Sequence, residues 1–134
     1  FIQDYHIDNG ILYGCVKRNI PFVLTGSIRD DGPLPEVYAD AYQGAYAMRS
    51  LVRGATTVIC LATMLHTIAA GNMTPSFRVL PDGTVRPVYL YAVDADEFVV
   101  NKLRDRGSLC ATTMVTNVQD FITKVARDLG VYPK

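Results

Sequence analysis

The chain lacks an excess of charge of either sign. Thirteen Lys and Arg residues balance thirteen Asp and Glu residues. Such a balance gives no electrostatic basis for binding nucleic acid or an anionic membrane, so we expect neither partner. No apolar run approaches the roughly 20 residues that a membrane span requires. There is also no signal-peptide pattern, and the sequence therefore predicts a cytoplasmic protein.

Groups that hold metals or act as nucleophiles are scarce. The three cysteines are odd in number and far apart, and each lies within or beside an apolar run: Cys15, Cys60 and Cys110. This pattern is typical of buried, reduced thiols. No spacing of His, Cys, Asp and Glu resembles a zinc site, so we expect no metal. The Gly-x-Gly-x-x-Gly fingerprint of common dinucleotide-binding folds is absent as well.

The composition favours a packed fold over disorder. Hydrophobic residues make up 49% of the 134 residues and charged residues only 19%. This length predicts one domain over residues 1–134. Because the chain begins with Phe1 rather than Met, we expect it to be a segment of a longer protein or a processed product.

Strand-like and helix-like segments alternate along the chain. Apolar runs rich in β-branched residues predict strands over 21–25, 57–62, 88–93 and 110–115. Amphipathic spacing and end signals predict helices over 9–19, 35–52, 63–71, 96–106 and 118–129. Residues 73–86 break the pattern with Pro81-Asp82-Gly83, which predicts a surface excursion or a small hairpin. The fold class is therefore α/β, with about four parallel strands and helices on both faces.

Candidate binding residues follow each expected strand. Ligands of open α/β sheets bind at the carboxyl ends of the strands, so we expect these residues to line one crevice. They are Gly26, Ser27, Arg29, Asp30 and Asp31; Thr63, Met64, Leu65 and His66; Asp94 and Asp96; and Thr116 and Asn117.

Asp94 carries the clearest chemical signal. An acidic residue between an apolar strand and a helix is placed to accept hydrogen bonds from ribose hydroxyls. The alternative is an ordinary helix cap, which suits Asp94 or Asp96 equally. Without the glycine fingerprint, backbone amides at Gly26-Ser27 or at the helix start near Thr63 would hold a pyrophosphate.

The sequence allows either a site role or a structural role for two other polar residues, His66 and Asn72. His66 lies one turn after a strand end, which favours a site role, but a histidine on a short apolar helix is also typical of packing. Asn72 follows Gly71 and either contacts a ligand or closes its helix.

Three stretches together resemble one microbial family: Gly26–Pro35, Leu61–Met73 and Lys102–Ser108. It is the family labelled the conserved region of the lysine-oxoglutarate reductase/saccharopine dehydrogenase bifunctional enzyme. Its members include a type of ornithine cyclodeaminase and the carboxyl-terminal half of bifunctional arginine dihydrolase/ornithine cyclodeaminases. The resemblance runs from about Gly10 to Phe121. It implies a Rossmann-like NAD-binding fold related to that of deoxyhypusine synthase. It also implies that residues 1–134 are the carboxyl-terminal part of a longer protein, because family members carry a large amino-terminal part.

The resemblance also implies a chemistry. NAD takes a hydride from ornithine and returns it to a cyclised product, so that proline and ammonia form. The residues assigned to NAD are Gly26, Ser27, Ile28, Met64, Leu65, Asn72, Asp94, Asp96, Thr116 and Asn117. In the catalytic assignments, Arg29 holds a carboxylate, Asp30 or Asp31 neutralises an amine or acts as base, and His66 takes a site role.

The sequence departs from the family pattern after two strands. The family reads Val-Asp-Ile-Asn-Pro where this chain has Val93-Asp94-Ala95-Asp96-Glu97, and Thr-Asp-Val where it has Thr116-Asn117-Val118. Two alternatives to the cyclodeaminase remain. One is a non-catalytic NAD-binding or oligomerisation module, and the other is a saccharopine-type dehydrogenase domain, which the family label alone suggests. In each case we expect the chain to pack against a missing amino-terminal part of the protein or against a second copy of itself. We also expect the protein to form a homo-oligomer.

Overall fold

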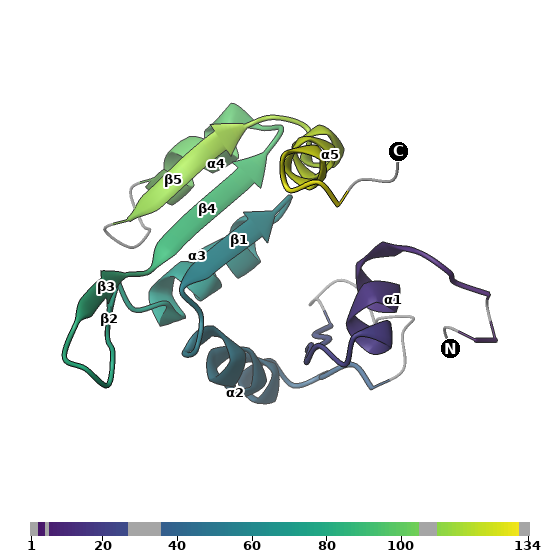
Figure 1. The fold of residues 1–134 in the computed structure, drawn as a ribbon, viewed down its shortest axis with the longest axis horizontal. Coiled ribbons are helices and arrows are strands. Elements are labelled where there is room, and N and C mark those ends of the chain that lie inside the picture. The colour runs from purple at the N-terminus through teal and green to yellow at the C-terminus, as the bar shows by residue number, and fades with distance from the viewer. Residues whose placement is uncertain (1–2, 5, 27–35, 105–109, 132–134) are drawn as a thin grey trace. The chain divides into compact units, whose positions relative to one another are not determined.

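The computed structural model describes residues 3–4, 6–26, 36–104 and 110–131 of the chain (Figure 1). The chain divides into two compact units, Phe1–Leu51 and Val52–Lys134. Each unit is described by itself below.

The first unit holds the two helices predicted for it. Helix α1 spans Gly10–Lys17, as the spacing of its apolar residues predicts. Helix α2 spans Ala41–Val52, so the predicted helix start at residue 35 is wrong. The cause is Asp40, whose Oδ1 accepts a hydrogen bond from the Gln43 amide at 2.8 Å and caps the helix there.

The predicted strand over residues 21–25 does not join the sheet. Thr25 forms an isolated parallel bridge with Tyr38 instead. The Tyr38 amide donates to the Leu24 carbonyl at 2.9 Å, and the Gly26 amide donates to the Tyr38 carbonyl at 3.1 Å. The apolar run satisfies its backbone groups with a nearby segment, so a short apolar run alone was insufficient to predict a sheet strand.

Helix α2 packs closely against this bridge through Gly44. A Cβ atom on the buried Gly44 would lie 2.9 Å from Cγ2 of Thr25 and 3.6 Å from Cβ of Tyr38. The Thr25 methyl group is on a short, branched side chain that has little freedom to move away. The absence of a side chain at Gly44 therefore permits the contact.

Gly44→Ala is expected to lower the free energy of unfolding by about 1 kcal/mol. Overpacking costs about 1–3 kcal/mol, and alanine recovers up to about 1 kcal/mol of helix propensity. Gly14→Ala in α1 is the matched control, because a Cβ there meets no atom within 4 Å. Urea unfolding of both variants tests the contact. Equal stabilisation by the two substitutions would contradict it.

The second unit contains a parallel sheet with the strand order β1-β4-β5 (Figure 1). Its strands are β1 (Thr57–Leu61), β4 (Tyr89–Asp94) and β5 (Ala111–Val115). Cys60 lies opposite Ala92, and Ala92 lies opposite Thr113. The predicted parallel sheet is confirmed, with three strands rather than four within the described ranges.

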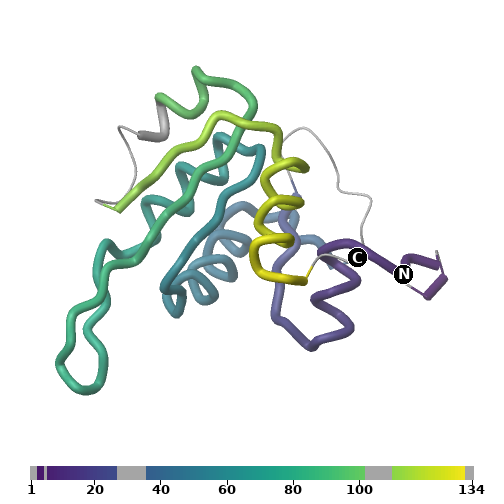
Figure 2. Tube along the Cα trace, turned by 45° about the horizontal axis from the view of Figure 1, so that its top comes forward, coloured from purple at the N-terminus to yellow at the C-terminus, as the bar shows by residue number. Residues whose placement is uncertain are grey.

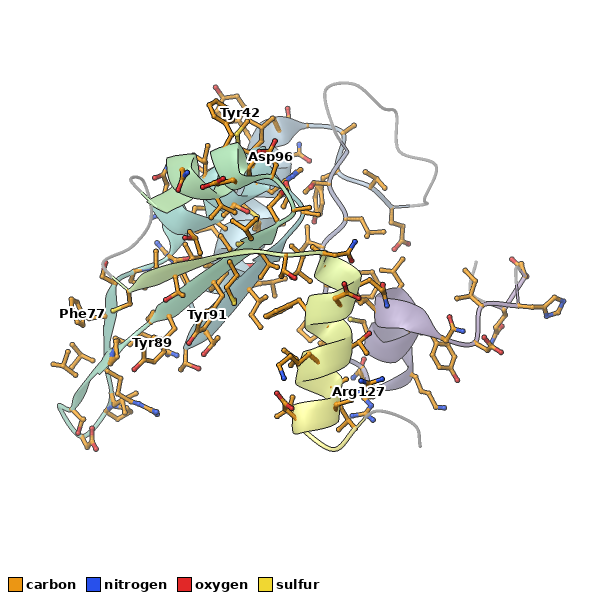
Figure 3. The ribbon with its side chains drawn as sticks, turned by 90° about the horizontal axis from the view of Figure 1, so that it is seen from above. Tyr42, Phe77, Tyr89, Tyr91, Asp96 and Arg127 are labelled. Carbon is orange, nitrogen blue, oxygen red and sulfur yellow. The ribbon has the colours of Figure 1, made fainter. Side chains whose placement is uncertain are left out.

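Helices cover both faces of this sheet. Helices α3 (Met64–Met73) and α4 (Glu97–Arg104) are the connections from β1 to β4 and from β4 to β5. Two right-handed crossovers in the same direction place both helices on one face. Helix α5 (Val118–Asp128) follows β5 and lies on the other side of the sheet from α4 (Figure 3). Leu90, which is 2% exposed, packs with Cys60 and Ala70 beneath the first face.

Residues 73–86 contribute the hairpin that their turn signal predicts. Strand β2 (Phe77–Val79) pairs antiparallel with β3 (Val85–Pro87). Gly83 occupies the left-handed region in the turn, with φ of 82°. Figure 2 shows the hairpin extending from the sheet as a two-stranded arm.

No helix within the described ranges is both long and apolar enough to cross a membrane.

Candidate functional site

The carboxyl ends of the three parallel strands lie level with one another. The Ala62 amide donates to the Val93 carbonyl at 2.9 Å, and the Thr116 amide donates to the Asp94 carbonyl at 2.9 Å. Each strand is followed by the start of a helix at this edge. The sheet therefore brings together the polar residues after three of the predicted strands.

Helix α3 starts in an unusual way. Ala62 has a φ of 52°, in the left-handed region that non-glycine residues rarely adopt. Thr63 is the N-cap residue, but its side chain makes no capping hydrogen bond to the helix. Its Oγ1 instead lies 3.0 Å from Nδ1 of His66. The amides of the first turn therefore receive no acceptor from the residue that normally supplies one.

The other two helix starts at this edge are closed by their own side chains. Oδ1 of Asp96 accepts a hydrogen bond from the Phe98 amide at 2.8 Å, at the start of α4. Oδ1 of Asn117 accepts from the Gln119 amide at 2.8 Å and from the Asp120 amide at 3.4 Å. Of these three helix starts, only that of α3 presents amides without a cap from its own N-cap residue, which favours it as the place for an anion.

Asp94 and Asp96 differ in their hydrogen bonds. Oδ1 of Asp94 accepts from the Asp96 amide at 2.9 Å, which fixes the orientation of a half-buried carboxylate. Its second oxygen has no partner in the part of the chain that the structure describes. Asp96 is exposed and its carboxylate caps α4 (Figure 3). The α4 capping role that the sequence left open between the two therefore belongs to Asp96. Each carboxylate keeps its second oxygen without a partner among the described residues, and that of Asp94 lies at the end of β4.

His66 and Leu65 are both exposed on the first turn of α3, whereas Met64 is half-buried. The imidazole of His66 does not pack within the part of the chain that the structure describes, which favours a site role. Leu65 is 70% exposed, so the same turn presents an apolar side chain beside the polar ones.

The structure does not place every predicted site residue at this edge. Asn72 lies in the last turn of α3, roughly 12 Å along the helix axis from its first residue, and does not close the helix. Gly26 belongs to the first unit, where it ends the bridge to Tyr38. The other predicted residues lie outside the described residues: Ser27, Ile28, Arg29, Asp30 and Asp31.

Nothing in the described ranges groups three or more His, Cys, Asp or Glu residues for a metal ion. All three cysteines are free, with Cys60 buried and Cys15 and Cys110 half-buried. Burial raises the pKa of the Cys60 thiol, although a hydrogen bond with Thr67 opposes the shift. Cys60 is therefore a protonated core residue rather than a nucleophile.

Two features of the site went beyond the sequence interpretation. Thr63 and His66 have the N-cap and N3 spacing of a capping box, which was a usable signal for their pairing. The left-handed backbone of Ala62 had no signal, because nothing about an alanine indicates a positive φ.

Comparison with known proteins identifies a family. A family model described as arginine dihydrolase ArgZ-like, C-terminal, Rossmann fold matches residues 2–125. An ornithine cyclodeaminase of Methanocaldococcus jannaschii is 43% identical over 92% of this chain, and the chain spans 27% of that protein. The bifunctional arginine dihydrolase/ornithine cyclodeaminase ArgZ of Synechocystis is 42% identical over 92% of this chain, which spans 16% of it.

Solved structures agree in fold. A protein from Methanococcus maripaludis, described as LOR/SDH (lysine-oxoglutarate reductase/saccharopine dehydrogenase), matches 96% of this chain with a TM-score of 0.80 and 38% identity. The chain covers 35% of that protein. The ternary complex of AgrE with ornithine and NAD+ matches 96% of this chain with a TM-score of 0.78 and 39% identity, and the chain covers 18% of it.

Proposed function

The chain belongs to the family of ArgZ-like C-terminal Rossmann-fold domains, and we propose that it is the NAD-binding part of an ornithine cyclodeaminase. Relatives with 43% and 47% identity are named ornithine cyclodeaminases. A structural relative with 39% identity was solved with ornithine and NAD+. Because the chain spans only about a quarter of the first of these, 27%, the complete reaction is proposed for the whole protein.

One observation carries the cofactor proposal. The uncapped start of α3 follows β1, and Asp94 ends β4, the strand next to β1. A Rossmann fold binds the pyrophosphate at the helix after one strand and the adenosine ribose at an acidic residue after the neighbouring strand. The chain offers both groups in this order without the glycine fingerprint.

The other proposed contacts with NAD come from residues at the same carboxyl edge of the sheet. The first-turn amides of α3, including those of Met64 and Leu65, are assigned to the pyrophosphate, and the free oxygen of Asp94 is assigned to the ribose. Oδ1 of Asn117 is engaged as a cap, so its amide nitrogen and Thr116 are the groups left for the cofactor after β5. Asp96 and Asn72 are left out, since Asp96 caps α4 and Asn72 lies at the far end of α3.

NAD, when bound, supplies a hydride acceptor for the α-carbon of ornithine and returns the hydride to the cyclised product. The chain supplies the groups that orient the substrate and move protons. From residue type, Arg29 is assigned to the substrate carboxylate and Asp30 or Asp31 to an amine. His66 is assigned to proton transfer, because its exposed ring lies on the first turn of α3.

A second candidate is a module that binds NAD without catalysis. The altered sequence around Asp94 favours it. It differs from the first candidate in one measurable property, because it predicts NAD binding without turnover.

Turnover by the full-length protein tests the proposal. Ornithine with catalytic NAD should give equal amounts of proline and ammonia, with no net reduction of the cofactor. Ornithine acetylated on the δ-nitrogen is the control, because it cannot cyclise and should give no proline. Binding of NAD with no ammonia would favour the non-catalytic module. Net reduction of NAD with ornithine would favour a dehydrogenase.

A further inference from the structure

We propose that Thr63 is a positioning residue that keeps the proton on Nδ1 of His66, so that Nε2 is the nitrogen that exchanges protons with the substrate. This inference rests on the proposed function, in which His66 moves protons. It adds a role for Thr63 and a protonation pattern for His66 that the sequence did not assign.

The geometry of the first turn of α3 supports this role. Thr63 is the N-cap residue and His66 lies three positions later, and their Oγ1 and Nδ1 atoms are 3.0 Å apart. A threonine at the N-cap ordinarily accepts from a helix amide. Here the hydroxyl makes no such bond and contacts the imidazole instead. The helix thus lacks a side-chain cap at the position where the imidazole is held.

The second ring nitrogen is free to act. His66 is exposed, and Nε2 has no partner in the part of the chain that the structure describes. A histidine that is bonded through one nitrogen presents the other in a defined direction. Nε2 is therefore the atom that a bound substrate would meet.

A hydroxyl is a suitable partner for a ring that gains and loses a proton. Oγ1 accepts a hydrogen bond from Nδ1–H when the ring is neutral and when it is an imidazolium. The contact then stays unchanged while Nε2 takes up a proton and releases it. No rotation of the ring is needed between the two steps.

The proton balance at His66 closes for the α-nitrogen of the substrate. The δ-ammonium group loses its own proton to water before its nitrogen attacks. The α-ammonium group of the substrate must lose a proton before its carbon is oxidised, and the lone pair of Nε2 takes it, giving an imidazolium. The same nitrogen of the substrate later leaves as ammonia and needs a proton, which Nε2–H returns. The ring ends neutral, with its proton on Nδ1.

Thr63→Ser and Thr63→Val form the test pair in the full-length protein. Serine keeps the hydroxyl, and valine keeps the shape without it. Nitrogen-15 NMR of histidine rings gives the protonated nitrogen, with the His66 signals identified as those lost in His66→Asn. We expect Nδ1–H in the neutral ring of the wild type and the serine variant, and a mixture of tautomers in the valine variant.

Kinetics provide the second measurement. The valine variant should lose at least tenfold in kcat for ornithine, the serine variant should recover most of it, and NAD affinity should change by less than about threefold in both. Proton on Nε2 in the wild type, or a valine variant with unchanged kcat, would overturn the inference while leaving the cyclodeaminase in place. A wild type without ornithine turnover would instead overturn the proposed function, and with it the role of His66.

Discussion

Thr63→Asp is expected to strengthen helix α3 and to weaken NAD binding in the same variant. An aspartate at the N-cap accepts hydrogen bonds from the first-turn amides that Thr63 leaves uncapped. This stabilises the helix by about 0.5–1 kcal/mol. The same carboxylate occupies the amides assigned to the pyrophosphate and places a negative charge beside it. At about 4 Å and partial solvent exposure, the repulsion costs about 2–3 kcal/mol, so affinity should fall by roughly 30- to 150-fold.

Thr63→Asn separates the effect of the added charge on NAD affinity from the effect of occupying the first-turn amides. Asparagine caps about as well as aspartate but carries no charge, so its NAD affinity should lie between those of the wild type and the aspartate variant. Isothermal titration calorimetry gives the affinities, and thermal unfolding gives the stabilities. Unchanged NAD affinity in Thr63→Asp would show that the pyrophosphate lies away from α3. A loss of stability parallel to the loss of affinity would show that the variant damages the fold instead.

The parts of the fold that were predictable from sequence are those with strong local signals. The central strand β4 is a continuous apolar run, and a strand buried on both faces requires that pattern. Gly83 and Gly130 have the positive φ angles that mark the hairpin turn and the end of α5. In each case the signal lies in the residue types of the segment itself, so a single sequence was sufficient.

The errors arose where a tertiary contact decides the structure. The apolar run before Gly26 has the composition of a strand, but its partner is the segment around Tyr38 rather than the sheet. The start of α2 moved to Ala41 because Asp40 caps it and Tyr38 pairs with Thr25. Residue types alone do not indicate which segment will form hydrogen bonds with the backbone N–H and C=O groups of such a run.

The candidate site shows the same division. The sequence identified the polar residues at the strand ends, because their positions after apolar runs are visible in the chain. It allowed either ribose binding or helix capping for each of two acidic residues, Asp94 and Asp96. The structure separates them by the amides that they bind and by burial, since the exposed Asp96 caps α4 and the half-buried Asp94 binds the Asp96 amide. Hydrogen-bond partners of this kind depend on atoms that residue spacing does not specify.

Asp94→Ala is expected to weaken NAD binding by about 1–3 kcal/mol, which corresponds to roughly 5- to 150-fold in affinity. The loss follows from removing charge-assisted hydrogen bonds to the adenosine ribose. Selectivity should change as well. A carboxylate at the ribose repels the 2′-phosphate of NADP, so the variant should prefer NAD over NADP less strongly than the wild type does. Calorimetric titration with both cofactors measures the two effects.

Asp96→Ala is the matched control for this substitution. Oδ1 of Asp94 accepts from the Asp96 amide at 2.9 Å, and Oδ1 of Asp96 accepts from the Phe98 amide at 2.8 Å. Each alanine variant therefore removes one side-chain hydrogen bond at the start of α4, and both should lose about 0.5–2 kcal/mol of stability. Only Asp94→Ala should lose NAD affinity, because Asp94 ends β4, the strand next to β1, whereas Asp96 lies beyond the strand as the exposed cap of α4. Equal affinity in the two variants would mean that Asp94 orders the turn before α4 and does not bind the ribose.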